Sequence, residues 1–216
     1  RAGAKGRLVI AIVDYGRGNL GSVEKAFCRL GMDAVVTQDS REVLGAEAVV
    51  LPGDGAFHDA MRNLEARGLL EPLREVLLAG RPFLGICLGY QLLFSESEEF
   101  GQGKGLDLIP GLVRRFPRGP EALKIPHMGW NQVIHSGDLT LFDGIPSGAY
   151  FYFVHSYYPQ LTGEPPKVAT CAYGVTFPAA IEKGSLFGTQ FHPEKSQKWG
   201  LKLLENFAAF VKDRRG

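Results

Sequence analysis

Apolar strands that alternate with amphipathic helices fill the first half of this 216-residue chain. Residues 8–15 are nearly all apolar, as a strand covered on both faces should be. Residues 22–31 then have the periodicity of an amphipathic helix that ends at Gly31. Further strands are expected at 33–37, 46–53 and 81–87, and further helices at 69–80 and 88–94. This alternation predicts a parallel sheet with helices on both sides.

The second half has a different texture, with Gly- and Pro-rich turns between short strands. Strands are expected there at 129–134, 149–154, 167–173, 177–183 and 185–191. They indicate an antiparallel extension, and an amphipathic helix over 196–213 closes the chain. With 45% hydrophobic residues, the length suits one core. We therefore predict a short flexible arm at 1–7 and one α/β domain over 8–216 with a mixed, mostly parallel central sheet.

Charge and cysteine content narrow the possible functions. The 24 Lys plus Arg and 23 Asp plus Glu give a net charge of +1, so no strong field favours nucleic acid or an anionic membrane. The three cysteines lie far apart without a CxxC spacing, which argues against disulfides or a zinc site and fits a reducing cytoplasm. The basic start precedes only about seven apolar residues, too few for a signal sequence or a membrane span.

A possible cofactor site needs separate comment. Residues 16–21 satisfy the GxGxxG pattern of dinucleotide-binding loops, and Asp39 lies about where a ribose-binding acid would be expected. A lone fingerprint of this kind is weak. We therefore expect a cytoplasmic protein that needs neither a bound cofactor nor a metal ion.

The most informative segment is PFLGICLGYQLLF. Gly85-Ile86-Cys87-Leu88-Gly89 has the Gly-x-nucleophile-x-Gly spacing of a nucleophile elbow, a sharp turn from a strand into a helix. This turn would expose the Cys87 sulfur and direct a helix N-terminus at it, which favours a thiolate that attacks a carbonyl carbon. The backbone N–H of Leu88 would point at the developing oxyanion. On this pentapeptide alone, a buried structural cysteine remains the alternative.

A thiolate nucleophile needs an acid–base partner, and the segment GTQFHPEKS supplies a candidate. His192 and Glu194 follow a predicted strand at alternate positions, so their side chains should point the same way. The carboxylate can fix the imidazole tautomer through Nδ1–H while Nε2 faces Cys87. His127 and His155 have no acid at this spacing, so neither is expected to be the base. A surface turn is the alternative interpretation of the segment.

Together these residues resemble class I glutamine amidotransferases, whose signatures are similar to GICLGYQ and FHPE. The segments DYGRGNLGSV, PGDGAF, PHMGWN, YFVHSYY and HPEKS look specifically like the glutaminase subunits of imidazole glycerol phosphate synthases, so the likeness covers most of the chain. The resemblance implies a flavodoxin-like fold. It also implies an enzyme that hydrolyses L-glutamine through a cysteinyl thioester. It also implies a heterodimer with a (β/α)8-barrel cyclase that uses the ammonia in histidine biosynthesis.

The resemblance implies roles for individual residues. Cys87 would be the nucleophile, His192 the general acid–base group and Glu194 its orienting partner. Groups implied to bind the substrate or its oxyanion are Gly53, Gly55, Leu88, Gln91, Glu99, Ser156 and Tyr157. Of these, Glu99 would hold the substrate ammonium, and Ser156 and Tyr157, with the backbone of Gly55, would hold the far end of the substrate and its carboxylate. Residues implied to contact the partner are Asn19, Met128, Trp130, Tyr152 and Lys195.

The loop Pro52-Gly53-Asp54-Gly55 departs from the family pattern. It follows a predicted strand, and its glycine-flanked backbone should supply the second oxyanion donor. Family members usually carry an apolar residue where this chain has Asp54. A negative charge near the oxyanion would be unfavourable unless it pointed to solvent or paired with a cation. We hypothesise that the loop rests turned away from Cys87 until the partner binds its ligand.

Other functions stay open at the level of sequence. The nearest alternative is the glutaminase component of anthranilate, aminodeoxychorismate or formylglycinamidine synthesis, which PHMGWN and HPEKSQ disfavour. A cysteine hydrolase or peptidase for another acyl substrate belongs to a different class. So does a catalytically silent regulatory module of the same fold, although intact Cys87, His192 and Glu194 weigh against silence.

Overall fold

The computed structural model describes residues 9–117 and 123–214, so the arm predicted at 1–7 lies outside the described residues. The strands are β1 (Val9–Val13), β2 (Asp33–Thr37), β3 (Ala48–Leu51), β4 (Phe83–Ile86), β5 (Phe94–Ser97), β6 (Gly103–Lys104), β7 (Ile109–Arg115), β8 (His127–Val133), β9 (Ala149–His155), β10 (Tyr157–Leu161), β11 (Lys167–Tyr173), β12 (Val175–Lys183) and β13 (Leu186–Thr189). The α-helices are α1 (Leu20–Arg29), α2 (Ser40–Gly45), α3 (Phe57–Ala66), α4 (Leu70–Leu78), α5 (Leu88–Gln91) and α6 (Gln197–Asp213). Two short 3₁₀ turns are η1 (Thr140–Phe142) and η2 (Pro193–Lys195).

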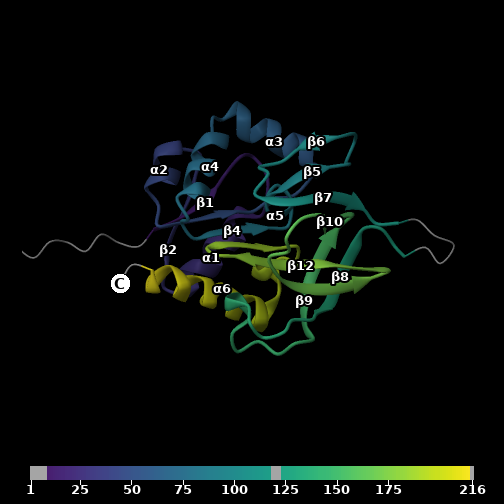
Figure 1. The fold of residues 1–216 in the computed structure, drawn as a ribbon. Coiled ribbons are helices and arrows are strands. Elements are labelled where there is room, and N and C mark those ends of the chain that lie inside the picture. Colours follow the sequence, from purple (N-terminus) through teal and green to yellow (C-terminus); the bar gives the residue numbers. More distant parts are fainter. Residues whose placement is uncertain (1–8, 118–122, 215–216) are drawn as a thin grey trace, which may run out of the picture.

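A seven-stranded sheet of order β11-β12-β13-β4-β3-β1-β2 forms the centre of the molecule (Figure 1). From β13 to β2 all neighbours are parallel, whereas β12 is antiparallel to both β13 and β11. The predicted fold class, a mixed and mostly parallel sheet flanked by helices, is therefore confirmed.

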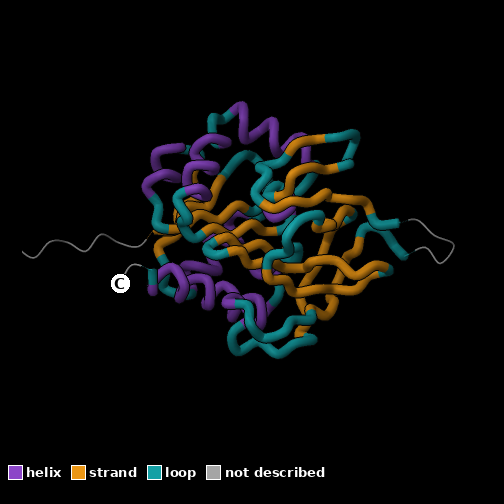
Figure 2. Tube along the Cα trace, viewed as in Figure 1, coloured by secondary structure: helices purple, strands orange, loops and turns teal. Residues whose placement is uncertain are grey.

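Helices cover both faces of this sheet, as Figure 2 shows. The core on one face includes residues of α1 and α6, and the core on the other includes residues of α2, α3 and α4. In β1, Ile10 and Ile12 belong to the first core, whereas Ala11 and Val13 belong to the second. Successive side chains of a strand point to opposite faces, and both faces of β1 are covered, which is why this strand is apolar at every position.

The remaining strands lie beside the central sheet, at the right of Figure 1. A four-stranded sheet has the order β10-β7-β5-β6, and β8 and β9 form an antiparallel pair. Strands predicted as one antiparallel extension are thus divided. β11 and β12 extend the central sheet, whereas β8, β9 and β10 belong to separate sheets.

One predicted strand has a different partner from the expected one. The sequence predicts 185–191 as part of the antiparallel extension, but β13 lies within the central sheet and is parallel to β4. Gly188 lies opposite Gly85 in this pairing. The other edge of β13 pairs with antiparallel β12, so β13 joins the two halves of the chain.

One predicted helix is shorter than expected. The helix predicted over 88–94 ends at Gln91, and the chain enters β5 at Phe94. Leu92, Leu93 and Phe94 are all 0% exposed. A segment buried on every side lacks the polar face of a surface helix, and its apolar run also suits a buried strand.

We predict that Gly89→Ala lowers the free energy of unfolding by about 2 kcal/mol, a typical cost of overpacking a core. A Cβ on Gly89 would collide with the carbonyl oxygen of Leu51 at the end of β3. Urea denaturation measures the change. Gly21→Ala in α1 is the matched control, because its added Cβ meets no atom within 4 Å and should be neutral or slightly stabilising. Equal losses in both variants would contradict this account.

Candidate active site

Cys87 lies at the junction of β4 and α5 with φ 54° and ψ −107°, a conformation that non-glycine residues rarely adopt. Its backbone N–H donates to the carbonyl oxygen of Thr189 in β13 at 2.7 Å. A Cβ on Gly85 would lie 2.8 Å from the carbonyl oxygen of Gly89, so the flanking glycines permit the turn. The predicted sharp turn is therefore present, and it places Cys87 at the carboxyl edge of the parallel strands.

His192 and Glu194 form a buried pair next to this turn. His192 Nδ1 lies 2.8 Å from Glu194 Oε1, and the two side chains are 6% and 1% exposed. The His192 N–H donates to Tyr152 O at 3.0 Å, and Ser196 Oγ donates to His192 O at 2.6 Å, so the backbone is held on both sides. Because Nδ1–H donates to the carboxylate, Nε2 remains available. Nε2 is buried and accepts or donates no hydrogen bond among the described residues.

Opposing effects determine the charge of His192. Burial lowers the pKa of the imidazole, but the Cys87 thiolate and the Glu194 carboxylate outweigh burial and raise the pKa of His192 to about 10. These neighbours therefore favour the protonated form of His192. A protonated imidazole beside a cysteine places a proton donor next to a nucleophile.

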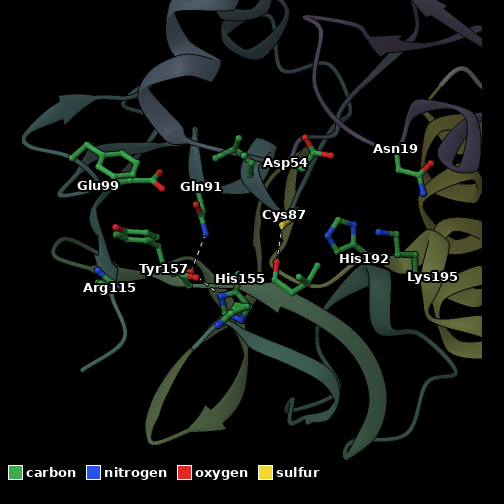
Figure 3. A pocket seen from close by; sticks show the side chains of 16 residues that line it. Asn19, Asp54, Cys87, Gln91, Glu99, Arg115, His155, Tyr157, His192 and Lys195 are labelled. Carbon is green, nitrogen blue, oxygen red and sulfur yellow. Dashed lines mark hydrogen bonds between the residues drawn. The ribbon is translucent and has the colours of Figure 1, made fainter. Parts of the chain in front are cut away.

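Cys87 and His192 line a pocket of about 640 Å³ (Figure 3). The predicted site residues that also line it are Asn19, Gly55, Leu88, Gln91, Glu99, Ser156, Tyr157 and Lys195. Those predicted residues that do not line it are Gly53, Met128, Trp130, Tyr152 and Glu194. Glu194 lies behind His192, which it contacts through a hydrogen bond.

Gln91 and Gln190 connect the nucleophile to the rest of the pocket. Gln91 Nε2 donates to Tyr157 O at 2.9 Å and to Gln190 Oε1 at 3.0 Å. Gln190 Nε2 lies 3.8 Å from Cys87 Sγ, which therefore receives an amide donor. α5 has only four residues, so its dipole is smaller than the predicted helix would give. The sequence analysis missed Gln190, because a lone polar residue in an apolar strand carries no pattern.

Glu99 is buried at 8% exposure and accepts the backbone N–H of Phe57 at 2.7 Å. Burial raises the pKa of its carboxyl group, and the Phe57 hydrogen bond opposes that rise. A buried carboxylate that lines a pocket is suited to an ammonium ligand, because the ion pair would offset the cost of its burial.

The 52–55 loop lies across the pocket from His155 (Figure 3) and passes close to Tyr15. Gly53 is buried and packs so near the Tyr15 hydroxyl that a Cβ would collide with it, whereas Asp54 is exposed. Burial, then the charges of Asp54 and Cys87, raises the pKa of Tyr15. The Tyr15 hydroxyl has no hydrogen-bond partner among the described residues. Asp54 lines the same pocket as Cys87 (Figure 3), so its charge lies near the nucleophile.

A chain of two histidines supports the floor of the pocket. Asn131 Nδ2 lies 3.1 Å from His127 Nε2, His127 Nδ1 lies 2.9 Å from His155 Nε2, and His155 Nδ1 lies 2.7 Å from Tyr157 O. Only one direction of donation satisfies all three contacts, since an amide N–H donates and a carbonyl accepts. Both rings are therefore neutral, each with its proton on Nδ1. Among the described residues, the hydrogen bonds of the two rings involve an amide, another imidazole and a carbonyl group, and no acid.

We predict that His127 and His155 stay neutral down to about pH 5, which an NMR titration of the ring protons can measure. Burial lowers the pKa of His127 to about 4 and the pKa of His155 to about 3. Because unfolded histidines take up a proton near pH 6.5, acidification below that pH binds more protons to the unfolded state and lowers the free energy of unfolding. A ring titration midpoint near 6.5 would contradict the predicted chain.

The predicted partner-contact residues occupy the surface next to the pocket. Met128 and Trp130 are 60% and 46% exposed on β8. Trp130 lies opposite Tyr152 of β9, with ring centroids 6.0 Å apart. Asn19 and Lys195 are exposed at the pocket itself. Asn19 and Lys195 thus border the pocket, whereas Met128, Trp130 and Tyr152 lie on the β8–β9 pair.

Among residues 9–117 and 123–214, no helix is both long and apolar enough to cross a membrane. The same residues contain no group of three or more His, Cys, Asp or Glu side chains placed to hold a metal ion.

Fold and site together define a class of protein. A cysteine at the strained end of a central strand, beside a histidine–glutamate pair on a mostly parallel sheet, has the form expected of triad-type amidotransferases. Residues 11–210 match the family described as glutamine amidotransferase class-I. The chain therefore belongs to the class I glutamine amidotransferase family.

Within that family the chain is similar to the subunits of one synthase. It is 55% identical over 202 residues to the imidazole glycerol phosphate synthase subunit HisH of Geobacter sulfurreducens, across 92% of this chain and 97% of that protein. The HisH subunit of Moorella thermoacetica is 55% identical, across 94% and 95%. The HisH subunit of Bacillus mycoides is 45% identical, across 94% and 95%.

Solved structures share the fold at lower identity. PurLQS from Thermotoga maritima has a TM-score of 0.72 and 17% identity, across 95% of this chain and 100% of that chain. A glutamine amidotransferase from Thermotoga maritima has a TM-score of 0.64, with 18% identity across 97% and 86%. At these identities the likeness supports the fold alone.

Proposed function

We propose that this chain is the glutaminase subunit of an imidazole glycerol phosphate synthase. It hydrolyses L-glutamine to L-glutamate and ammonia, and a partner cyclase uses the ammonia to form imidazole glycerol phosphate and an aminoimidazole carboxamide ribotide. The observation that carries the proposal is one pocket lined by both Cys87 and His192, in which Glu194 holds His192 by a hydrogen bond. The 55% identity to HisH subunits supports this synthase over other amidotransferases. A thiolate nucleophile also suits the reducing cytoplasm.

The reaction follows from the groups in the pocket. The Cys87 thiolate attacks the carboxamide carbon, and the carbonyl electrons move onto oxygen to give a tetrahedral oxyanion. The N–H of Leu88 and a backbone N–H of the 52–55 loop stabilise this oxyanion. The His192 imidazolium protonates the nitrogen, so ammonia leaves and a glutamyl thioester remains. Neutral His192 then takes a proton from water, which attacks the thioester and releases glutamate.

Glutamine binding uses groups at a distance from the sulfur. Both N–H groups of the Gln91 amide have partners, so its oxygen is the group left to accept a hydrogen bond from the substrate. The Glu99 carboxylate binds the substrate ammonium. Ser156, Tyr157 and the backbone of Gly55 surround the far end of the substrate.

A partner is needed because released ammonia becomes ammonium in neutral water and loses its nucleophilicity. The sequence has no GxxxxGK[ST] phosphate loop to indicate a second, ammonia-accepting site. The partner is a (β/α)8-barrel cyclase that forms a heterodimer with this chain. Exposed Met128 and Trp130 suit the core of such an interface, and Asn19, Tyr152 and Lys195 suit its polar margin next to the pocket.

We predict that Cys87→Ala and His192→Ala each reduce glutamine-dependent synthesis by at least about 1,000-fold, because each removes a group that changes bonds. Synthesis from added ammonium salts by the complex should stay within about twofold, since the cyclase is unchanged. Product formation with either nitrogen source is the measurement. Loss of both activities would instead indicate disrupted assembly.

Two further variants serve as controls for this experiment. Cys28→Ala removes an exposed thiol in α1 and should leave both activities unchanged. Strong inhibition by that change would mean that the nucleophile is assigned to the wrong cysteine. Glu194→Gln should have a smaller effect than Cys87→Ala, because nucleophile and base remain and only the orientation and charge of His192 are disturbed.

The 52–55 loop suggests regulation of the same reaction. We predict that the isolated chain hydrolyses glutamine slowly, that the cyclase accelerates it, and that the phosphoribulosyl ligand of the cyclase accelerates it further. The physical reason is the negative charge of Asp54, which disfavours an oxyanion nearby until the loop is reset. Glutamate release measured under the three conditions tests this. If the isolated chain were as fast as the liganded complex, the prediction would be contradicted.

A further inference from the structure

Arg115 is a cation at the far end of the active-site pocket with no assigned role. It lines the pocket together with Cys87, yet it ends β7 in the smaller sheet. Figure 3 shows Cys87 and His192 towards one end of the pocket and Glu99, Tyr157 and Arg115 towards the other. The pocket thus has a reactive end and a charged end.

The guanidinium of Arg115 forms no hydrogen bond or ion pair with the residues that the structure describes. Its backbone is nevertheless fixed. Arg115 pairs with Tyr157 across β7 and β10, and its backbone N–H donates to Glu98 Oε1 at 2.7 Å. A cation on an ordered backbone, without a counter-ion and beside a pocket, is available to an anionic ligand.

The adjacent arginine has a different environment. Arg114 Nε lies 3.6 Å from Glu98 Oε2, and Arg114 Nη1 donates to Gln160 Oε1 at 2.9 Å. Adjacent residues of a strand point to opposite faces, so Arg114 and Arg115 project in different directions. The Glu98 carboxylate therefore pairs with the Arg114 side chain. Of the two arginines, Arg115 is the one that lines the pocket.

We propose that Arg115 binds the α-carboxylate of glutamine and so selects the free amino acid. The inference rests on the glutaminase function proposed above. A glutamine whose carboxamide reaches Cys87 extends its ammonium and α-carboxylate towards the charged end of the pocket. Glu99 matches the ammonium there, and Arg115 matches the carboxylate through its planar pair of N–H donors.

This arrangement has a consequence for specificity. A glutaminyl residue in a peptide, or glutamine with a neutral α-amide, offers no α-carboxylate and loses this ion pair. Arg115 is exposed, so water and salt screen its charge and the preference is moderate. We expect discrimination of about tenfold, expressed in KM, because the contact lies far from the bonds that change.

The experiment compares L-glutamine with its α-amide as substrates for the complete complex of this chain and its cyclase. Release of glutamate, or of glutamate α-amide, gives KM and kcat for each. Arg115→Gln should raise KM for glutamine about tenfold, leave kcat within about twofold, and leave KM for the α-amide unchanged. Arg114→Gln is the matched control and should change neither KM. Arg115→Lys keeps the positive charge and should retain part of the preference for glutamine.

The outcomes separate this inference from the proposed function. An unchanged KM for glutamine in Arg115→Gln, or an equal rise for both substrates, would overturn the role of Arg115 while glutaminase activity stands. If the unsubstituted complex released no glutamate from glutamine, the proposed function would fail, and the inference with it. A loss of substrate discrimination confined to Arg115→Gln supports the assignment.

Discussion

The parallel pairing of β4 with β13 is the contact on which the active site depends. It places Ile86 opposite Thr189, and the Thr189 carbonyl oxygen accepts the N–H of Cys87. Neighbouring parallel strands end at the same edge of a sheet, so Cys87 and His192 meet although they lie far apart in the sequence. A slip of one residue in this register would turn every side chain of the shifted strand to the opposite face and separate the sulfur from the imidazole.

Charge, more than burial, decides which histidine carries a proton. His192 and His155 are similarly buried, at 5% and 6% exposure. The two anions beside His192 raise its pKa to about 10, whereas burial, with added repulsion from His127 and His192, lowers the pKa of His155 to about 3. Two nearby imidazoles can therefore serve opposite purposes, one as a proton donor and one as a neutral hydrogen-bonding support.

Local pattern predicted the parts of the structure that local physics determines. The apolar strands, the turn at Cys87 and the His192–Glu194 spacing follow from short-range rules, and the structure contains all three. The pairing of β13 with β4 could not be predicted from these rules, because an apolar run of this length suits a parallel or an antiparallel neighbour. Gln190 and Arg115 were missed for a related reason: long-range contacts decide whether such a residue faces a pocket or solvent.

The two ends of the pocket are built on different sheets, and Gln91 sets their separation. Its Nε2 donates both to Tyr157 O in the smaller sheet and to Gln190 Oε1, directly after β13 of the central sheet. Gln190 in turn donates to Cys87 Sγ, so a continuous run of amides joins the strand at the charged end to the nucleophile. Both glutamines are buried, which makes a broken link costly. The pocket thereby keeps a constant length, which suits a substrate whose reactive carboxamide is separated from its charged groups by a short chain of methylenes.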